Sequence, residues 1–161
     1  MFRVGFSVDR HLLDWDKKGM NLGGLYFKDF PSTDAYSDGD AMLHSICEAF
    51  LGAMGFDDLG TYYNPETKPK NFSSLEIVAD VNKLLTSYNY IISNIDVTVV
   101  LDEPSLVDHK RDLRTNVAKF FHISETQVSI KATRTEINDK SLITVYSNVS
   151  VCGRDQKNGQ D

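Results

Sequence analysis

Cysteine and long apolar runs are scarce in this 161-residue sequence, and each shortage excludes a class of protein. Two cysteines, Cys47 and Cys152, are too few for a disulfide framework, so we expect a reducing compartment and a cytoplasmic location. No apolar run is long enough to cross a bilayer, so no membrane partner is expected. The first residues read directly as a strand, and no signal or transit peptide is expected.

Basic residues are also outnumbered: 17 lysines and arginines face 23 acidic residues, for a net charge of −6. Without a global basic field, nucleic acid is not expected as a partner, and phosphate binding would need local cations or metal ions. The hydrophobic content of 41% is ordinary for a globular protein. We expect one domain over residues 1–152 and a polar, disordered tail over 153–161.

Hydrophobic periodicity predicts an α+β fold, with a mixed β-sheet and helices packed on one face. The predicted strands cover residues 2–9, 23–27, 90–101, 127–136 and 141–151. The predicted helices run over 37–55, from Ser73 or Ser74 onward, and over 106–121, and residues 28–36 and 57–72 read as loops. Ser37 is the expected cap of the first helix, because its side chain can accept from free backbone N–H groups.

A divalent-metal site is the sharpest chemical prediction from the residues. Asp9 and His11 are two apart on a predicted strand, so their side chains point the same way. His44 lies in the second turn of the predicted helix, one turn beyond Asp40 on the same face, so Asp40 could orient His44 or a neighbouring ligand. One carboxylate and two imidazoles suit zinc and leave a coordination position open. Taken alone, however, an Asp-x-His pair is more often a solvated or hydrogen-bonded pair than a metal site.

The sequence around these residues resembles that of a known family, and the resemblance extends to about Val151. Its motifs keep both order and spacing. They are Arg3-Val-Gly-Phe-Ser-Val-Asp9-Arg-His11, Leu22-Gly-Gly, Ser37-Asp-Gly-Asp-Ala-Met-Leu-His44, Leu51-Gly-Ala, Asp58-Leu-Gly60, Asn94-Ile-Asp-Val-Thr98 and Val128-Ser-Ile-Lys-Ala-Thr-Arg-Thr-Glu136. The sequence closely resembles the 2-C-methyl-D-erythritol 2,4-cyclodiphosphate synthase family.

The resemblance implies a homotrimer with active sites between subunits and a lyase reaction in non-mevalonate isoprenoid (terpenoid) biosynthesis, the methylerythritol phosphate pathway. The substrate would be 4-diphosphocytidyl-2-C-methyl-D-erythritol 2-phosphate, a nucleotide that is cyclised with release of CMP. The resemblance places Zn²⁺ on Asp9, His11 and His44. It assigns Glu136 to a second ion, Mg²⁺ or Mn²⁺, on the substrate diphosphate.

The resemblance also assigns substrate contacts and two catalytic positions. The substrate-binding positions are Ser37, Asp58, Leu59, Gly60, Tyr63, Leu101, Pro104, Ser105, Leu106, Thr133 and Thr135. The catalytic positions are Tyr36, where the family has histidine, and Arg134, where it has threonine. A tyrosine can donate a hydrogen bond but carries no positive charge at neutral pH, so the two changes could compensate for one another.

Two further departures fall near the expected substrate. Ser105 replaces the family's lysine beside the cytidine pocket, and residues 137–141 replace a longer Gly-Phe-x-Gly-Arg-x-Glu-Gly segment. Three functions therefore stand side by side. The first is the cyclodiphosphate synthase, the second a divergent trimeric metal-binding paralogue that binds another phosphorylated or nucleotide ligand without this catalysis, and the third a purely structural trimer.

Overall fold

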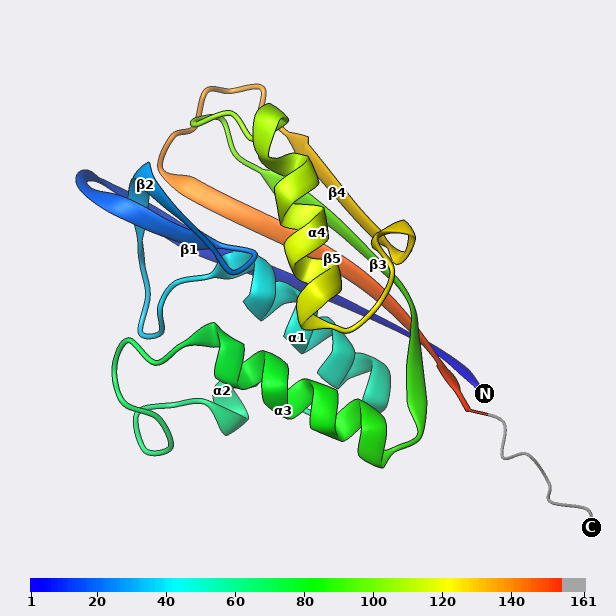
Figure 1. Ribbon diagram of the computed structural model, residues 1–161. Helices are drawn as coiled ribbons and strands as arrows, with labels where there is room; N and C mark the ends of the chain where they lie inside the picture. Colours follow the sequence, from blue (N-terminus) through cyan, green and yellow to red (C-terminus); the bar gives the residue numbers. More distant parts are fainter. Residues whose placement is uncertain (155–161) are drawn as a thin grey trace, which may run out of the picture.

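Two long strands near the N-terminus form a hairpin that projects from the sheet. The computed structural model describes residues 1–154, and in it β1 spans Phe2–Leu22 and pairs antiparallel with β2, Leu25–Asp34 (Figure 1). The predicted strand over 2–9 was therefore too short. The strand predicted over 23–27 started two residues too early, because Gly23 and Gly24 form the turn with φ of 58° and 72°, and it ended seven residues too soon.

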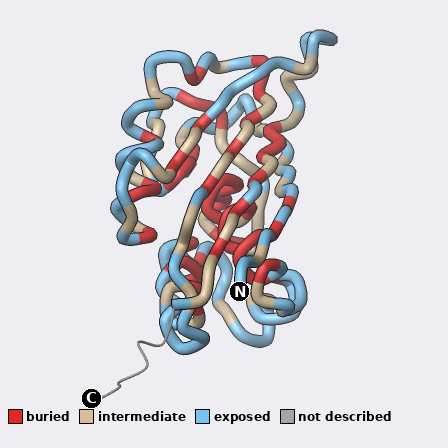
Figure 2. The backbone as a smooth tube through the Cα atoms, turned by 90° about the vertical axis from the view of Figure 1, so that its right-hand side faces the viewer, coloured by how far each residue is buried: buried red, intermediate tan, exposed pale blue. Residues whose placement is uncertain are grey.

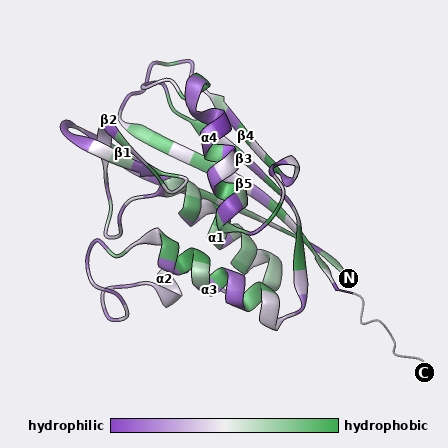
Figure 3. Ribbon diagram, in the orientation of Figure 1, coloured by the Kyte–Doolittle hydropathy of each residue, from purple (hydrophilic) through white to green (hydrophobic). Residues whose placement is uncertain are grey.

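The loop predicted over 28–36 is mostly strand. Pro31 and Ser32 lie within β2, which is an edge strand of the sheet. An edge strand tolerates proline because its outer N–H groups have no ladder partner to lose. The pairing of β1 with β2 shifts register between Asp14 and Met20, and Figure 3 shows this end of the hairpin to be hydrophilic.

The sheet is mixed, as predicted, with the order β2-β1-β5-β3-β4. Strand β3, Tyr90–Val100, runs parallel to β4, Val128–Thr133, and antiparallel to β5, Leu142–Gly153. The predicted alternation of β3 is confirmed, with Ile95, Val97 and Val99 buried. Strand β4 ends before Arg134, so the three residues from Arg134 to Glu136 belong to a loop and not, as predicted, to the strand.

The predicted C-terminal tail begins within described structure. Gly153 ends β5, and the backbone N–H of Arg154 donates to the carbonyl of Asn89 at 2.8 Å. Residues 155–161 of that tail lie outside the described residues. Among residues 1–154, no helix is both long and apolar enough to span a membrane.

Helices α1, Ala41–Met54, α3, Ser74–Ser87, and α4, Lys110–Phe120, lie on the same side of the sheet (Figure 1). The short elements are α2, Leu59–Tyr62, within the predicted 57–72 loop, η1, Val107–His109, and η2, Glu125–Gln127. Figure 2 shows the buried residues concentrated between the sheet and these helices. The close packing of α1 against β1 depends on Gly5, where a Cβ atom would lie 1.8 Å from the carbonyl oxygen of Ala49 on α1.

Helix α1 begins four residues later than predicted, and its cap is Asp40 and not Ser37. The Asp40 carboxylate accepts hydrogen bonds from the backbone N–H groups of Leu43, Gly23 and Gly24. One carboxylate thus caps the helix and fixes the β1–β2 turn, which a serine hydroxyl could not do. Ser37 instead accepts from the N–H of Gly39, which has a φ of 75°.

Candidate metal centre

Asp9, His11 and His44 meet where β1 passes the first turn of α1. Oδ2 of Asp9 lies 2.9 Å from Nε2 of His11 and 3.5 Å from Nδ1 of His44. One possible ligand atom from each residue falls within 4.8 Å of the others, and among the described residues this is the one group of three such side chains. The fold therefore brings the predicted triad together, although the sequence placed His44 one turn further along its helix.

The donor set fits a divalent cation such as zinc. Oδ2 of Asp9 and Nε2 of His11 are both buried and have no hydrogen-bond partner, because their short approach lacks hydrogen-bond geometry. Unpaired buried polar atoms are costly, so two of them aimed at one point indicate a missing ligand. A carboxylate and two imidazoles supply the oxygen and nitrogen donors that zinc prefers.

The charges of the triad support each other. Burial opposes ionisation of Asp9, but the close contacts of its carboxylate with the imidazoles of His11 and His44 outweigh burial, so the pKa of the carboxyl lies well below its usual range. Burial likewise opposes the charge on His44, while Asp9 outweighs it and raises the pKa of this imidazole. Asp9 is thus an ionised carboxylate that favours a proton or a cation beside His44.

The second ring nitrogen of His44, Nε2, contacts two serines that the sequence analysis did not connect with this histidine. Nε2 lies 2.8 Å from Oγ of Ser74 and 3.2 Å from Oγ of Ser37. Asp40, the residue expected there, instead uses its carboxylate for the three backbone N–H groups at the helix cap. The only advance signal for Ser74 was its place at the predicted start of the second helix.

A pocket of about 190 Å³ opens beside the triad. His11 and His44 line it together with four predicted substrate or catalytic residues, namely Tyr36, Ser37, Leu59 and Tyr63. The Tyr36 hydroxyl donates to the carbonyl of Lys68 at 3.0 Å, and the Tyr63 hydroxyl donates to Asp80 at 3.1 Å. Asp58, in the α2 cap position, and Gly60 flank this wall, and Asp58 accepts from the Thr61 hydroxyl.

The remaining predicted residues lie in and around a different pocket, of about 210 Å³, at the ends of β3 and β4. Arg134 and Glu136 line it with Asp102, Glu103 and Asn138, and it shares no lining residue with the triad pocket. The backbone N–H and the hydroxyl of Thr135 both donate to Asp102, and the hydroxyl contact is the main reason that the pKa of Asp102 is lowered.

The predicted cytidine-binding stretch differs in exposure along its length. Leu101 and Leu106 are core residues, with 5% and 3% of their surface exposed. Pro104 and Ser105 lie between them on the accessible side, and Thr133 holds the stretch by accepting from the N–H of Leu101 at 3.0 Å. The accessible residues between the two leucines, Glu103 to Ser105, could contact a ligand without disturbing the core.

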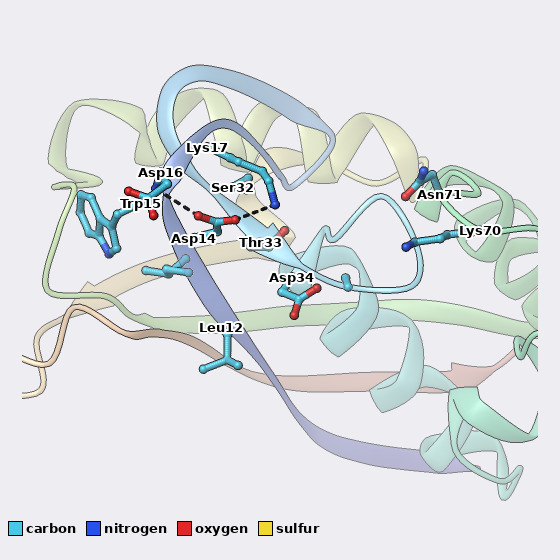
Figure 4. Close-up of a pocket in the computed structure, with 12 residues that line it drawn as sticks. Leu12, Asp14, Trp15, Asp16, Lys17, Ser32, Thr33, Asp34, Lys70 and Asn71 are labelled. Carbon is cyan, nitrogen blue, oxygen red and sulfur yellow. Dashed lines mark hydrogen bonds and ion pairs between the residues drawn. The ribbon is translucent and has the colours of Figure 1, made fainter.

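A further hollow, of about 570 Å³, lies under the β1–β2 hairpin and was not anticipated from the sequence. Figure 4 shows Asp14 and Lys17 paired within the hairpin, at 2.9 Å, with Lys70 and Asn71 approaching from the loop before α3. The indole N–H of Trp15 donates to the carbonyl of Lys140 at 2.6 Å. The hairpin thereby supports the shortened 137–141 segment.

Comparisons of the sequence with known proteins find relatives over most of the chain. The family model described as the YgbB family matches residues 2–151. The 2-C-methyl-D-erythritol 2,4-cyclodiphosphate synthase of Francisella tularensis subsp. tularensis is 35% identical over 136 residues, which cover 84% of this chain and 86% of that protein.

Solved structures of similar proteins superpose closely on this chain. A structure of IspF from Plasmodium falciparum, a CDP complex, superposes with a TM-score of 0.81 at 28% identity, covering 94% of this chain and 96% of that one. The bifunctional IspDF from Campylobacter jejuni superposes with a TM-score of 0.86 at 30% identity, and here 94% of this chain spans 42% of the longer protein.

The mixed sheet, the helices on one face and the Asp-His-His cluster between them define a class of α+β proteins with a candidate metal site at a strand–helix junction. Within that class, the chain belongs to the YgbB family, whose similar members are named as cyclodiphosphate synthases.

Proposed function

We propose that this protein is a cyclodiphosphate synthase of non-mevalonate isoprenoid biosynthesis, a lyase. It converts 4-diphosphocytidyl-2-C-methyl-D-erythritol 2-phosphate into the cyclic diphosphate and CMP. An oxygen of the 2-phosphate forms a bond to the β-phosphorus of the diphosphate, and the bond from that phosphorus to the CMP oxygen breaks. The observation that carries the proposal is the assembled Asp9-His11-His44 cluster in a chain of this family.

The physical difficulty of this reaction is that two anionic phosphates must be brought together. Asp9, His11 and His44 would hold Zn²⁺, as their unpaired buried donor atoms indicate. When bound, such an ion neutralises charge and polarises a phosphoryl group as a Lewis acid. The chain's own residues complete the wall: Tyr36 and Ser37 line the pocket, and Asp58, next to Leu59 of the same wall, would contact the methylerythritol unit.

The pocket at the ends of β3 and β4 would bind the nucleotide side of the substrate. Glu136 would help to hold Mg²⁺ or Mn²⁺ on the diphosphate, and Arg134 adds a cation beside it. The 101–106 stretch, with Thr133 and Thr135, would contact the cytidine. The support is that a solved relative with this fold is described as a CDP complex.

A homotrimer would unite the two pockets, which are separate within one chain. The sheet face opposite the helices supports this assembly. Phe2, Val4, Phe6 and Val8 alternate along β1 and are 44–63% exposed, and the ring of Tyr146 stacks on Phe6 at 6.3 Å. An exposed apolar stripe of this kind is typical of an interface between protein subunits.

The experiment that tests the function is direct. The purified protein, supplied with zinc and magnesium, is incubated with the cytidyl substrate, and CMP release is followed over time. We expect release well above background and none from His44→Ala. If zinc binds but no CMP appears, the synthase assignment is wrong and a non-catalytic metal-binding paralogue remains. A cytoplasmic location and a single domain over residues 1–152 stay part of the same proposal.

A further inference from the structure

We propose that Ser74 and Asp38 are positioning residues that select the tautomer of His44, so that its Nδ1 is free to face the metal centre. This inference rests on the proposed metal-binding function of Asp9, His11 and His44. It assigns a role to two residues outside the cluster. Ser74 lies at the start of α3, and Asp38 lies in the loop before α1.

The argument starts from the hydroxyl group of Ser74, which lies between a carboxylate and an imidazole. Its Oγ contacts Oδ1 of Asp38 on one side and lies 2.8 Å from Nε2 of His44 on the other. A serine hydroxyl has one proton to donate, and an ionised carboxylate can only accept. The proton of Ser74 therefore points to Asp38, and the remaining lone pair of Ser74 accepts from an N–H at Nε2 of His44.

The orientation of Asp38 is fixed independently of His44. Its second oxygen, Oδ2, accepts from the backbone N–H of Ser74 at 2.9 Å, so both carboxylate oxygens face the same residue. Ser74 is fully buried, which leaves no room for water to substitute for either contact. The chain from Asp38 through Ser74 to His44 is thus set by the packing of α3 against the start of α1.

The consequence concerns the other nitrogen of the ring. A neutral imidazole carries one proton, so a proton on Nε2 leaves Nδ1 with a free lone pair. Nδ1 is the atom that lies 3.5 Å from Oδ2 of Asp9. Ser37 lies near the same Nε2, but at the longer distance of 3.2 Å, and among the described residues no carboxylate contacts its hydroxyl group. The shorter contact to Ser74, backed by a carboxylate, sets the direction of the hydrogen bonds.

A first measurement uses the unmodified, metal-free protein. Nitrogen NMR of the His44 ring, at a pH where it is neutral, reports which nitrogen carries the proton. We expect the proton on Nε2. A predominant Nδ1–H form would overturn the inference, whatever the protein's catalytic activity proves to be.

Two variants then test the consequence for metal binding. Ser74→Ala removes the acceptor, and we expect zinc affinity to fall about 10–100-fold, as for other residues that orient a metal ligand. Asp38→Asn can donate an amide N–H to Ser74, which would then donate to Nε2. We expect the NMR signals of this variant to shift towards the Nδ1–H form.

The matched control is Ser73→Ala. Ser73 caps the same helix by accepting from the N–H of Leu75, but it has no hydrogen bond to His44. We expect Ser73→Ala to keep the zinc affinity of the unmodified protein. Equal zinc affinity for Ser74→Ala and Ser73→Ala would contradict the inference. Absence of zinc binding by the unmodified protein would instead contradict the metal centre, and the NMR result would still decide the tautomer.

Discussion

The metal centre and the pocket around Glu136 differ in how far a single chain prepares them. In the metal centre, a strand and a helix carry the side chains, which are only 13–25% exposed and are supported from behind by serines and Asp38. In the second pocket, Arg134 and Glu136 are exposed and lie on a loop. The first region is preorganised for an ion, whereas the second presents charges that a substrate, an ion or a neighbouring subunit would have to organise.

The two regions are also stabilised by different means. The core of α1 and the sheet fixes Asp9 and His44, because burial and packing restrict their rotamers. The loop residues depend on a few polar contacts. Thr135 donates to Asp102, Lys140 pairs with Glu103 at 2.8 Å, and Trp15 donates to the carbonyl of Lys140. Substitutions should therefore separate metal binding from nucleotide handling.

The largest effect is expected for a substitution within the metal centre. Asp9→Asn removes the anionic ligand and should reduce zinc affinity by more than about 100-fold, beyond the loss typical of outer residues, and abolish CMP release. Zinc content after dialysis and the CMP assay measure the two effects. Asp14→Asn, further along the same strand, is the control and should keep both. Normal zinc content in Asp9→Asn would remove the basis of the comparison.

In the second pocket, Arg134→Thr should leave zinc content intact while slowing turnover. A charge-assisted hydrogen bond contributes about 1.5–3 kcal/mol, which corresponds to a reduction of about 10–100-fold in turnover. Glu136→Gln should likewise keep zinc but raise the magnesium concentration needed for half-maximal rate. Steady-state CMP release, at varied magnesium, checks both variants. If Arg134→Thr kept full turnover, the idea that Arg134 compensates for Tyr36 would be wrong.

A change in pH should change the zinc affinity of the metal centre. Because Asp9 raises the pKa of His44, the metal-free imidazole stays protonated to a higher pH than usual, and zinc must displace that proton. Zinc affinity should therefore fall as pH is lowered, by up to about tenfold per unit below that pKa. Calorimetry in buffers of different ionisation enthalpy would detect the released proton. An affinity independent of pH between about 6 and 8 would contradict this expectation.

The smallest effect is expected at the hairpin contact. Trp15→Phe removes the hydrogen bond to Lys140 and should lower the free energy of unfolding by about 1 kcal/mol, with zinc affinity unchanged. Denaturant unfolding followed by circular dichroism measures it. Lys18→Ala is the control, since it removes only the cation over the Trp15 ring, at 5.7 Å. A loss of zinc in Trp15→Phe would show that the two regions are coupled.

Much of the fold was predictable because hydrophobic periodicity is local. The alternation of β3 was predicted correctly, and the helix predicted to start at Ser73 or Ser74 starts at Ser74. The errors have local causes as well. Pro31 suggested a loop because an edge position cannot be recognised from sequence, and Ser37 resembled a cap because the competing contacts of Asp40 come from a distant turn.

The site was predictable in composition and not in arrangement. Asp9 and His11 share a face through strand geometry alone, but their meeting with His44 depends on the packing of α1 against β1 at Gly5. The residues behind His44 could not be inferred, because Ser74 is 30 positions further along the chain and reaches it only through the packing of α3.

By itself, the sequence determined most of the element types, through short-range periodicity, and the candidate donor atoms of the metal centre, through residue chemistry. The order and spacing of its motifs indicated the family. The tertiary structure alone decided three things. It converged the donors at one point, assigned Asp40 to the helix cap and Ser74 to His44, and separated the pocket of Glu136 from the metal centre. Such contacts join residues far apart in the chain, and only the packing of helices against a sheet fixes which distant side chains become neighbours.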